Sequence, residues 1–287
     1  MRIAVLILAH RDKRQLNKLL EHLAADFDLY VHLDRKSELR ERDLVRSERI
    51  TVMRSYAVYW GSFNQIGATL KLLRAAHSTG YDRYLLISGQ DVPVKSNREI
   101  IDFFSGNHNE YIECTRLPCW FWSNGGLDRI RKYHANSDRG VTGIRRIGIS
   151  VEKVLVDVLN RRAEHPREID YEFYGGSNWF NLTHDCVDKV LGYLKRNNSY
   201  LNRYKYTFCA DEIFMQTIVM MVCLPENVVK TCLRYIDWKS GPEFPRILRA
   251  DDYEKIVNAG MLFARKVDEG VDVDISEMLY AVAKNNS

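Results

Sequence analysis

Short apolar runs alternate with segments of helical spacing over the first part of the chain. "RIAVLILAH" and "YDRYLLISG" have nearly continuous apolar centres, which is typical of strands covered on both faces. The intervening segments repeat apolar residues every three or four positions, as amphipathic helices do. Strands joined by helical crossovers predict a mostly parallel sheet with helices on both faces. Strands are expected at residues 2–10, 27–34, 49–53 and 81–89, and helices at residues 12–25 and 61–80.

The pattern is less regular beyond residue 113. "LPCWFWSNGG" is aromatic and typical of a loop, and a basic stretch with helical parts follows at residues 139–168. Residues 171–197 predict a glycine turn, a short strand and a helix, and residues 208–222 an apolar helix. A strand entering a proline-glycine loop and a basic cluster before a final helix complete the chain. No repeat or flexible linker interrupts it, so we expect one α/β domain over residues 1–287.

Composition excludes few classes of protein. The 287 residues carry 42 basic and 38 acidic side chains, a formal charge of +4. This balance does not indicate nucleic-acid binding, although a local basic pocket for a phosphorylated ligand remains open. No apolar run approaches the roughly 20 residues of a membrane span, and the opening apolar stretch is short for a signal peptide. We therefore expect a cytoplasmic protein.

Several signature motifs are missing. The six cysteines are scattered without a C-x-x-C pair, which favours free thiols over zinc sites or a disulfide framework. Neither glycine-rich phosphate motif occurs, which argues against a dinucleotide oxidoreductase or a P-loop enzyme, and no G-x-S-x-G nucleophile elbow occurs. No D-x-D follows a central strand, where a nucleotide-sugar enzyme would need its metal clamp. We therefore expect lysine and arginine to neutralise any diphosphate.

Polar residues that follow the strands are the first candidates for binding, because ligands of parallel sheets lie beyond the strands' carboxyl ends. Asp34 follows the second strand, where a carboxylate accepts hydrogen bonds from a ribose or a base, or simply forms a turn. Asp91 in "SGQDVPVKS" is fixed before Pro93, either at a pocket rim or in a plain turn.

Two later blocks carry further candidates. In "YGGSNWF", Gly175 and Gly176 allow a close backbone approach, and Trp179 offers a face for a sugar ring. A tight turn before a core strand explains the same residues. In "LFARKVD", Arg265 and Lys266 either lie on the solvated surface or neutralise a diphosphate.

The segment "FCADEIFMQTIV" places two acids before an apolar helix. Asp211 can cap that helix, and Glu212 can interact with its dipole. Alternatively, Glu212 removes a proton from a substrate.

Taken together, these blocks resemble one family. "IAVLILAHRD", "YVHLDRKS", "VYWGSFNQIGATLKLLRAA", "YLLISGQDVPVKS", "GGSNWFNLT", "ADEIFMQT", "LRYIDW" and "LFARKVD" occur in this order. The chain resembles the core-2/I-branching N-acetylglucosaminyltransferase and peptide O-xylosyltransferase family over nearly its whole length. We expect a bacterial, cytoplasmic relative without the membrane anchor and the disulfide-rich stem of the animal Golgi members.

The resemblance implies an inverting, metal-independent glycosyltransferase of the GT-A-like, Rossmann-like α/β fold, with a UDP-sugar as donor and no cofactor required. It implies a nucleotide-binding half at about residues 1–110 and an acceptor-binding, catalytic half at about residues 111–287. The catalytic base falls on Glu212, and Asp211 is assigned to capping and orientation. The resemblance implies that Lys266 binds the diphosphate together with one of three arginines, Arg234, Arg249 or Arg265. The nucleotide contacts fall on Ala9, His10, Asp34, Tyr59 and Trp60, and the sugar and acceptor contacts on Asp91, Ser177, Trp179, Tyr235 and Trp238.

Donor and acceptor stay open at this point. GlcNAc, xylose and galactose all suit the resemblance, and the acceptor is a glycan or a lipid-linked oligosaccharide of surface polysaccharide biosynthesis. The basic stretch beginning near residue 139 can hold the protein at an anionic membrane. Two alternatives remain: a metal-dependent glycosyltransferase with Asp91 as ligand, and a noncatalytic carbohydrate-binding protein on the same fold.

Overall fold

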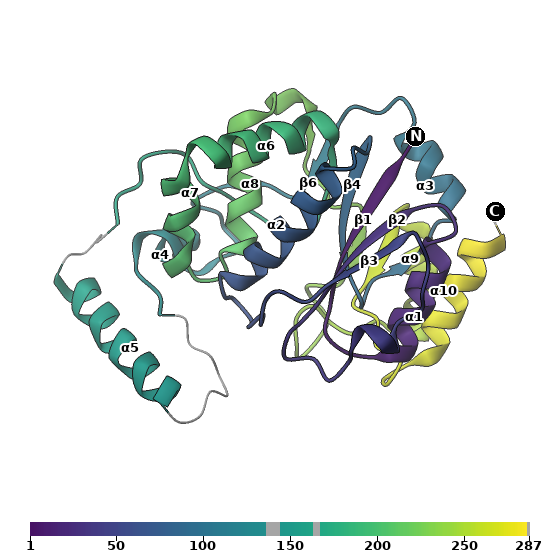
Figure 1. Cartoon of the computed structure of the whole chain (residues 1–287), viewed down its shortest axis with the longest axis horizontal. Coiled ribbons are helices and arrows are strands. Elements are labelled where there is room, and N and C mark those ends of the chain that lie inside the picture. The colour runs from purple at the N-terminus through teal and green to yellow at the C-terminus, as the bar shows by residue number, and fades with distance from the viewer. Residues whose placement is uncertain (136–143, 163–166, 286–287) are drawn as a thin grey trace.

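The computed structural model describes residues 1–135, 144–162 and 167–285 (Figure 1). A seven-stranded sheet forms its centre, with the spatial order β10-β6-β9-β4-β1-β2-β3. These strands are β1 (Ile3–Ala9), β2 (Asp28–Leu33), β3 (Ile50–Met53), β4 (Arg83–Ser88), β6 (Glu110–Ile112), β9 (Phe180–Thr183) and β10 (Val228–Val229). Strands β4, β1, β2 and β3 are mutually parallel, and β9 runs antiparallel between β4 and β6. The carboxyl ends of the four parallel strands therefore share one edge.

The described helices cover both faces of this sheet, except the one at residues 144–162, which stands apart from it (Figure 1). They are α1 (Lys13–Leu23), α2 (Asn64–His77), α3 (Asn97–Phe104), α4 (Leu127–Arg131), α5 (Ile144–Arg162), α6 (His184–Arg196), α7 (Asn198–Arg203), α8 (Asp211–Val222), α9 (Tyr253–Asn258) and α10 (Val273–Asn285). Helix α1 begins at Asp12, whose side chain accepts a hydrogen bond from the backbone N–H of Gln15 over 3.0 Å. Such a cap satisfies one of the unpaired donors of the first turn.

Successive residues of β1 belong to two different hydrophobic cores, because side chains alternate between the two faces of a strand. Ala4 and Leu6 join the core that contains α2, α6 and α8, whereas Val5 and Ile7 join the core that contains α1 and α3. Both faces of the strand are buried, which explains its continuous apolar sequence.

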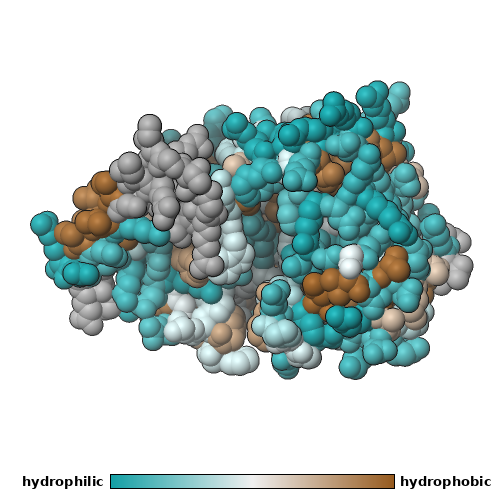
Figure 2. All heavy atoms as spheres, turned by 90° about the horizontal axis from the view of Figure 1, so that it is seen from below, coloured by the Kyte–Doolittle hydropathy of each residue, from teal (hydrophilic) through white to brown (hydrophobic). Residues whose placement is uncertain are grey.

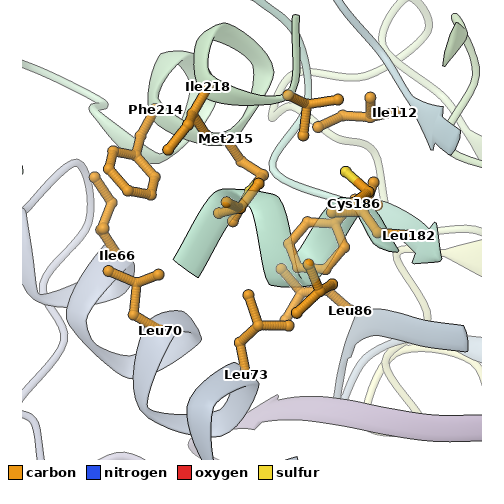
Figure 3. Close-up of a cluster of buried hydrophobic side chains, with 14 of the residues drawn as sticks. Ile66, Leu70, Leu73, Leu86, Ile112, Leu182, Cys186, Phe214, Met215 and Ile218 are labelled. Carbon is orange, nitrogen blue, oxygen red and sulfur yellow. The ribbon is translucent and has the colours of Figure 1, made fainter. Parts of the chain in front are cut away.

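Figure 3 shows the first of these cores at close range. Leu70 of α2, Met215 of α8 and Leu86 of β4 all contribute side chains to this cluster. Cys186 of α6 lies in the same cluster. Because residues 213–219 of α8 are buried in this core, the acids at its first turn have a fixed position relative to the strand ends.

A second, three-stranded sheet includes the short strand that follows β4 in the chain. It consists of β11 (Arg234–Ile236), β12 (Phe263–Arg265) and β5 (Val92–Pro93), with β12 in the middle. A two-stranded ribbon, β7 (Thr115–Arg116) with β8 (Tyr174–Gly175), lies apart from it. Helices α9 and α10 contribute to the core around the three-stranded sheet. This sheet places residues 234 and 265 beside the loop that follows β4.

The predicted fold class is confirmed: the structure is an α/β arrangement with a mostly parallel sheet and helices on both faces. The expected strands and helices of the first ninety residues all occur, with boundaries within three residues of those predicted. Of the predicted basic stretch, residues 139–143 and 163–166 lie outside the described part of the chain. The single domain and its division near residue 110 stay predictions.

Candidate active site

A cavity of about 680 Å³ opens at the carboxyl edge of β1, β2 and β4. Its wall is completed by the start of α8, by the loop before β9 and by the end of β12. Eleven of the predicted site residues line this cavity: Ala9, His10, Asp34, Trp60, Ser177, Trp179, Asp211, Glu212, Trp238, Arg265 and Lys266. Five others do not: Tyr59, Asp91, Arg234, Tyr235 and Arg249.

The strand ends hold Asp34 rigidly at one side of the cavity. Its backbone N–H donates to the carbonyl of Ala9 over 2.9 Å, which fixes the end of β2 against the end of β1. Its carboxylate accepts hydrogen bonds from the Lys36 backbone N–H at 2.8 Å and the Lys36 ammonium at 2.9 Å. The Lys36 ammonium also lies 4.4 Å from the ring centroid of Tyr59. Tyr59 thus supports this corner from outside the cavity wall.

His10 lies in the same corner. Burial lowers its pKa, and the charge of Arg11 lowers it further, so the imidazole is neutral near pH 7. A neutral imidazole can both donate and accept a hydrogen bond. This property suits a contact with a base or a ribose.

Positive charge gathers where β12 ends. Arg265 lines the cavity, and its guanidinium donates to the Ser88 hydroxyl and, over 3.2 Å, to Asp91. The next residue, Lys266, is half-buried in the cavity wall. Burial lowers the pKa of Lys266, and the charges of Arg11 and Arg265 lower it further. Among the described residues no carboxylate lies within 4.0 Å of its ammonium, so this charge is available to a ligand.

Asp91 is fully buried beneath this positive charge and does not border the cavity, contrary to the prediction. One carboxylate oxygen accepts from Arg234 Nε over 3.0 Å, and the other accepts from Arg265 and from the backbone N–H of Ser88 at 2.8 Å. Arg234 itself has a side chain that is 0% exposed. The three residues form a buried ion cluster, because an unpaired carboxylate at this depth would be strongly unfavourable.

Arg249 and Tyr235 also lie away from the cavity wall. The backbone N–H of Arg249 donates to Asp252 over 2.9 Å in a turn before α9, and Tyr235 packs against the core around the three-stranded sheet. Arg265 is therefore the one of the three candidate arginines that lines the cavity beside Lys266.

The two acids of α8 face the cavity from its opposite wall. The predicted cap at Asp211 is wrong: the N-cap residue is Ala210, and no side chain caps the helix. Burial and the neighbouring charge of Glu212 together raise the pKa of Asp211 to about 7. Burial also raises the pKa of Glu212, whose side chain is 30% exposed.

Arg129 of α4 opposes that shift. Its Nη1 donates to Oε2 of Glu212 over 2.6 Å, and this charge lowers the pKa of the carboxyl group. The guanidinium carbon lies 3.8 Å from the ring centroid of Trp122, which also lines the cavity. Neither residue was singled out from the sequence. The aromatic loop "LPCWFWSNGG" pointed to this region without identifying a partner for the acids.

The glycines of "YGGSNWF" serve internal packing. A Cβ on Gly176 would come within 2.1 Å of the Glu113 carbonyl oxygen, and one on Gly175 within 2.4 Å of the Trp122 ring. Both contacts favour the tight turn over a close approach to a ligand. Trp179 is 6% exposed, and the Arg265 guanidinium lies 4.4 Å from its ring centroid.

Exposed aromatic side chains border the cavity instead. Trp60 is 79% exposed and Trp238 is 47% exposed. Phe208 meets Trp60 edge to face, with 5.3 Å between the ring centroids. Such faces suit the apolar C–H surface of a sugar or the plane of a base.

Comparisons with known proteins agree with one family. The sequence model described as "Branch: Core-2/I-Branching enzyme" matches residues 3–258. Human "Xylosyltransferase 2" is 25% identical over 309 aligned residues, which cover 97% of this chain and 33% of that protein. "Xylosyltransferase oxt" of Drosophila pseudoobscura pseudoobscura is 21% identical and covers 98% and 33%. The chain thus spans about a third of the length of these curated relatives.

Among solved structures, the mannose-1-phosphate geranyltransferase of Thermus thermophilus is similar with a TM-score of 0.34 and 12% identity, over 76% of this chain and 68% of that one. Within the described residues, no helix has the length and apolar character required to cross a membrane.

Proposed function

Because the chain belongs to the Core-2/I-branching enzyme family, we propose that it is an inverting glycosyltransferase that uses a UDP-sugar. One observation carries this proposal. A single cavity has a carboxylate with a raised pKa, Glu212, on one wall and two adjacent cations, Arg265 and Lys266, on another. A transfer from a sugar diphosphate needs both kinds of group at once.

Glu212 is the general base of this reaction. It takes the proton of an acceptor hydroxyl, whose oxygen attacks the anomeric carbon on the face opposite the leaving UDP. The bond between that carbon and the UDP oxygen breaks, and the electron pair leaves with UDP. A positioned base typically contributes about 10² to 10⁴ to the rate. Burial raises its pKa and so increases its affinity for the proton, while the charge of Arg129 opposes that shift.

Lys266 and Arg265 stabilise the charge that develops on the diphosphate. Arg265 is oriented in advance by Asp91 and the Ser88 hydroxyl, so it need not rearrange as the bond breaks. Lys266 supplies a charge without a carboxylate partner among the described residues. On this basis we propose that UDP binds without a metal ion and that the enzyme needs no cofactor.

The metal-dependent alternative, with Asp91 as ligand, has little support from this geometry. Both oxygens of Asp91 are engaged by arginines, and the residue lies outside the cavity. Within the described part of the chain, the carboxylates of the cavity form no group of three with the spacing of metal ligands.

Asp34, His10, Ala9 and Trp60 line the cavity, and we propose that they bind the nucleoside. For Ser177, Trp179 and Trp238, which line the same cavity, we propose contacts with the sugar and the acceptor. Because the curated relatives are named xylosyltransferases, UDP-xylose is the first donor to test, followed by UDP-GlcNAc and UDP-galactose. The proposed acceptor is a glycan or a lipid-linked oligosaccharide.

The experiment is a UDP-release assay with each donor, in EDTA, with and without a panel of glycan acceptors. One donor should give UDP release that increases with a particular acceptor, and anomeric analysis of the product should show inversion. Release that appears only with Mn²⁺ would favour the metal-dependent alternative. Binding of glycans without release from any donor would favour a noncatalytic carbohydrate-binding protein.

Helix α5 supports a further part of this proposal, which is peripheral attachment to a membrane at its cytoplasmic face. In Figure 1 it stands apart from the sheet, and Figure 2 shows hydrophobic side chains at that end of the molecule. Exposed apolar residues recur there at helical spacing: Val151, Val154, Leu155, Val158 and Leu159. Its sequence also contains five basic and two acidic residues, which suits an anionic lipid surface.

Sedimentation with phosphatidylglycerol vesicles tests this attachment. The protein should bind these vesicles more strongly than phosphatidylcholine vesicles, and Leu155→Glu should weaken binding more than the matched change Asp157→Glu. Equal recovery with both vesicles would contradict it. Membrane attachment would place the enzyme beside lipid-linked intermediates of polysaccharide assembly.

A further inference from the structure

Two thiols approach each other at the edge of the sheet opposite the active-site cavity. Cys186 lies in the first turn of α6, which follows β9, and Cys223 is the residue at which α8 ends. Their sulfur atoms are 2.8 Å apart. Cys186 is completely buried, whereas Cys223 is half-buried and lines a separate cavity of about 600 Å³. A dithiol with one reachable member is the usual arrangement of a pair that can be oxidised.

The distance distinguishes between the two ways in which such a pair can be used. A disulfide bond is about 2.05 Å long, so closure needs an approach of less than an ångström. Two thiolates on a tetrahedral zinc ion, each about 2.3 Å from the metal, lie roughly 3.8 Å apart. To bind zinc, the two sulfur atoms would have to move apart by about 1 Å, which is more than the approach needed for a disulfide. The sulfurs are therefore nearer to the spacing of a bond than to that of two zinc ligands.

Glu110 is the third group of this cluster, with a carboxylate oxygen within 4.8 Å of both sulfurs. Both of its oxygens already accept hydrogen bonds from Thr183, at 2.8 Å from the backbone N–H and 2.5 Å from the hydroxyl. These bonds hold the carboxylate at the start of α6. Both oxygens of Glu110 are therefore already used in hydrogen bonds at the start of this helix.

We propose that Cys186 and Cys223 form a reversible disulfide when a low-molecular-weight disulfide such as oxidised glutathione enters the adjoining cavity. The Cys223 thiol loses its proton to water, and its sulfur attacks one sulfur of the small disulfide and displaces a thiolate. Cys186 then loses its proton and attacks the Cys223 sulfur, which releases the second thiolate. The two protein thiols are oxidised, and the small disulfide is reduced to two thiols that take up the two protons.

The bond would tie the start of α6 to the end of α8. Helix α8 has 12 residues and is about 18 Å long, so the new bond lies a helix length away from Glu212. Its effect is therefore on the stability of the folded chain, because a disulfide restricts the unfolded state. We expect nucleotide affinity to be equal in the reduced and oxidised forms.

The test uses the full chain equilibrated in glutathione buffers of increasing oxidising power. After free thiols are alkylated without denaturation, the digested protein should show the Cys186 peptide joined to the Cys223 peptide, with the loss of two hydrogen masses. Cys223→Ser should abolish this product, and Cys114→Ser, which changes another buried thiol, should leave it intact. The melting temperature should rise on oxidation in the wild type and in Cys114→Ser, and not in Cys223→Ser.

Two results would overturn the proposal. In the first, the protein is equilibrated in the most oxidising buffer and then unfolded, and both thiols are still fully alkylated. The other is one equivalent of zinc that copurifies with the wild type and blocks the cross-link until it is chelated. Because the cross-link is mapped in the wild type, neither result depends on whether a variant folds.

Discussion

Arg129 donates a 2.6 Å hydrogen bond to Glu212 from a short helix 83 residues earlier in the chain. The pair lies at the cavity wall, with side-chain exposures of 20% and 30%. Burial favours the protonated form of Glu212, and the guanidinium favours the carboxylate. The net effect is a raised pKa for the proposed base, and Arg129 limits that rise.

Replacing the base tests its role directly. Glu212→Gln keeps the size of the side chain and removes the proton acceptor, so the rate should fall about 10²- to 10⁴-fold while UDP-sugar affinity is retained. Steady-state kinetics and a binding titration measure the two effects separately. The matched change Glu172→Gln, at an exposed carboxyl group outside the cavity, should alter neither. More than a tenth of the wild-type rate in Glu212→Gln would remove Glu212 from the mechanism.

Removing Arg129 should shift the pH profile. The base acts when deprotonated, so log(kcat/KM) rises with pH through the pKa of Glu212 and then levels off. In Arg129→Met the influence that lowers this pKa is lost, and the rising limb should move to higher pH by about one unit or more. Arg131→Met, in the same short helix, is the control. An unchanged profile would mean that Arg129 does not control the pKa of the catalytic base.

Asp211 should make stability depend on pH. Its folded-state pKa is about 7, above the roughly 3.9 of an unfolded chain. Its favourable contribution is therefore complete below about pH 4 and is lost as pH rises through 7. Asp211→Asn lacks this contribution, so its stability relative to the wild type should increase between pH 4 and 8 in denaturant titrations. The exposed change Asp185→Asn should show no such trend.

The buried Asp91 should matter more for stability than for donor contact. Asp91→Asn leaves two arginines without their shared carboxylate, which should cost about 3 to 5 kcal/mol of unfolding free energy. Asp102→Asn removes an exposed ion pair and should cost less than about 1 kcal/mol. Chemical denaturation measures both. A stable Asp91→Asn protein that has lost a Mn²⁺-dependent activity would instead support the metal-dependent alternative.

Local pattern was enough to locate part of the site. The end of β2 is marked by the change from apolar to polar residues, and the carboxyl edge of a parallel sheet binds ligands, so the pattern made Asp34 a candidate, with a plain turn as the alternative. Glu212 and Lys266 depended on the family resemblance, because an acid pair before a helix and a basic pair after a strand are also common without function.

The remaining features depend on contacts that sequence spacing does not encode. Arg129 reaches Glu212 from a five-residue helix after an irregular loop. Asp91 meets Arg234 and Arg265 from 143 and 174 residues away, so its burial as a counter-ion was not visible in a motif that equally suits a pocket rim. The cap expected at Asp211 failed because Ala210 occupies the N-cap position.

The most direct test of metal-independent UDP binding is a thermal-shift titration with UDP in EDTA, on the wild type and on Lys266→Ala. At a hundredfold excess over its Kd, UDP should add about 2.7 kcal/mol to wild-type stability without any metal. Loss of the Lys266 charge should weaken UDP affinity about 10- to 100-fold, since hydrogen bonds to charged groups contribute about 1.5 to 3 kcal/mol. Stabilisation by UDP only after Mn²⁺ is added, to the same extent in both proteins, would contradict the account.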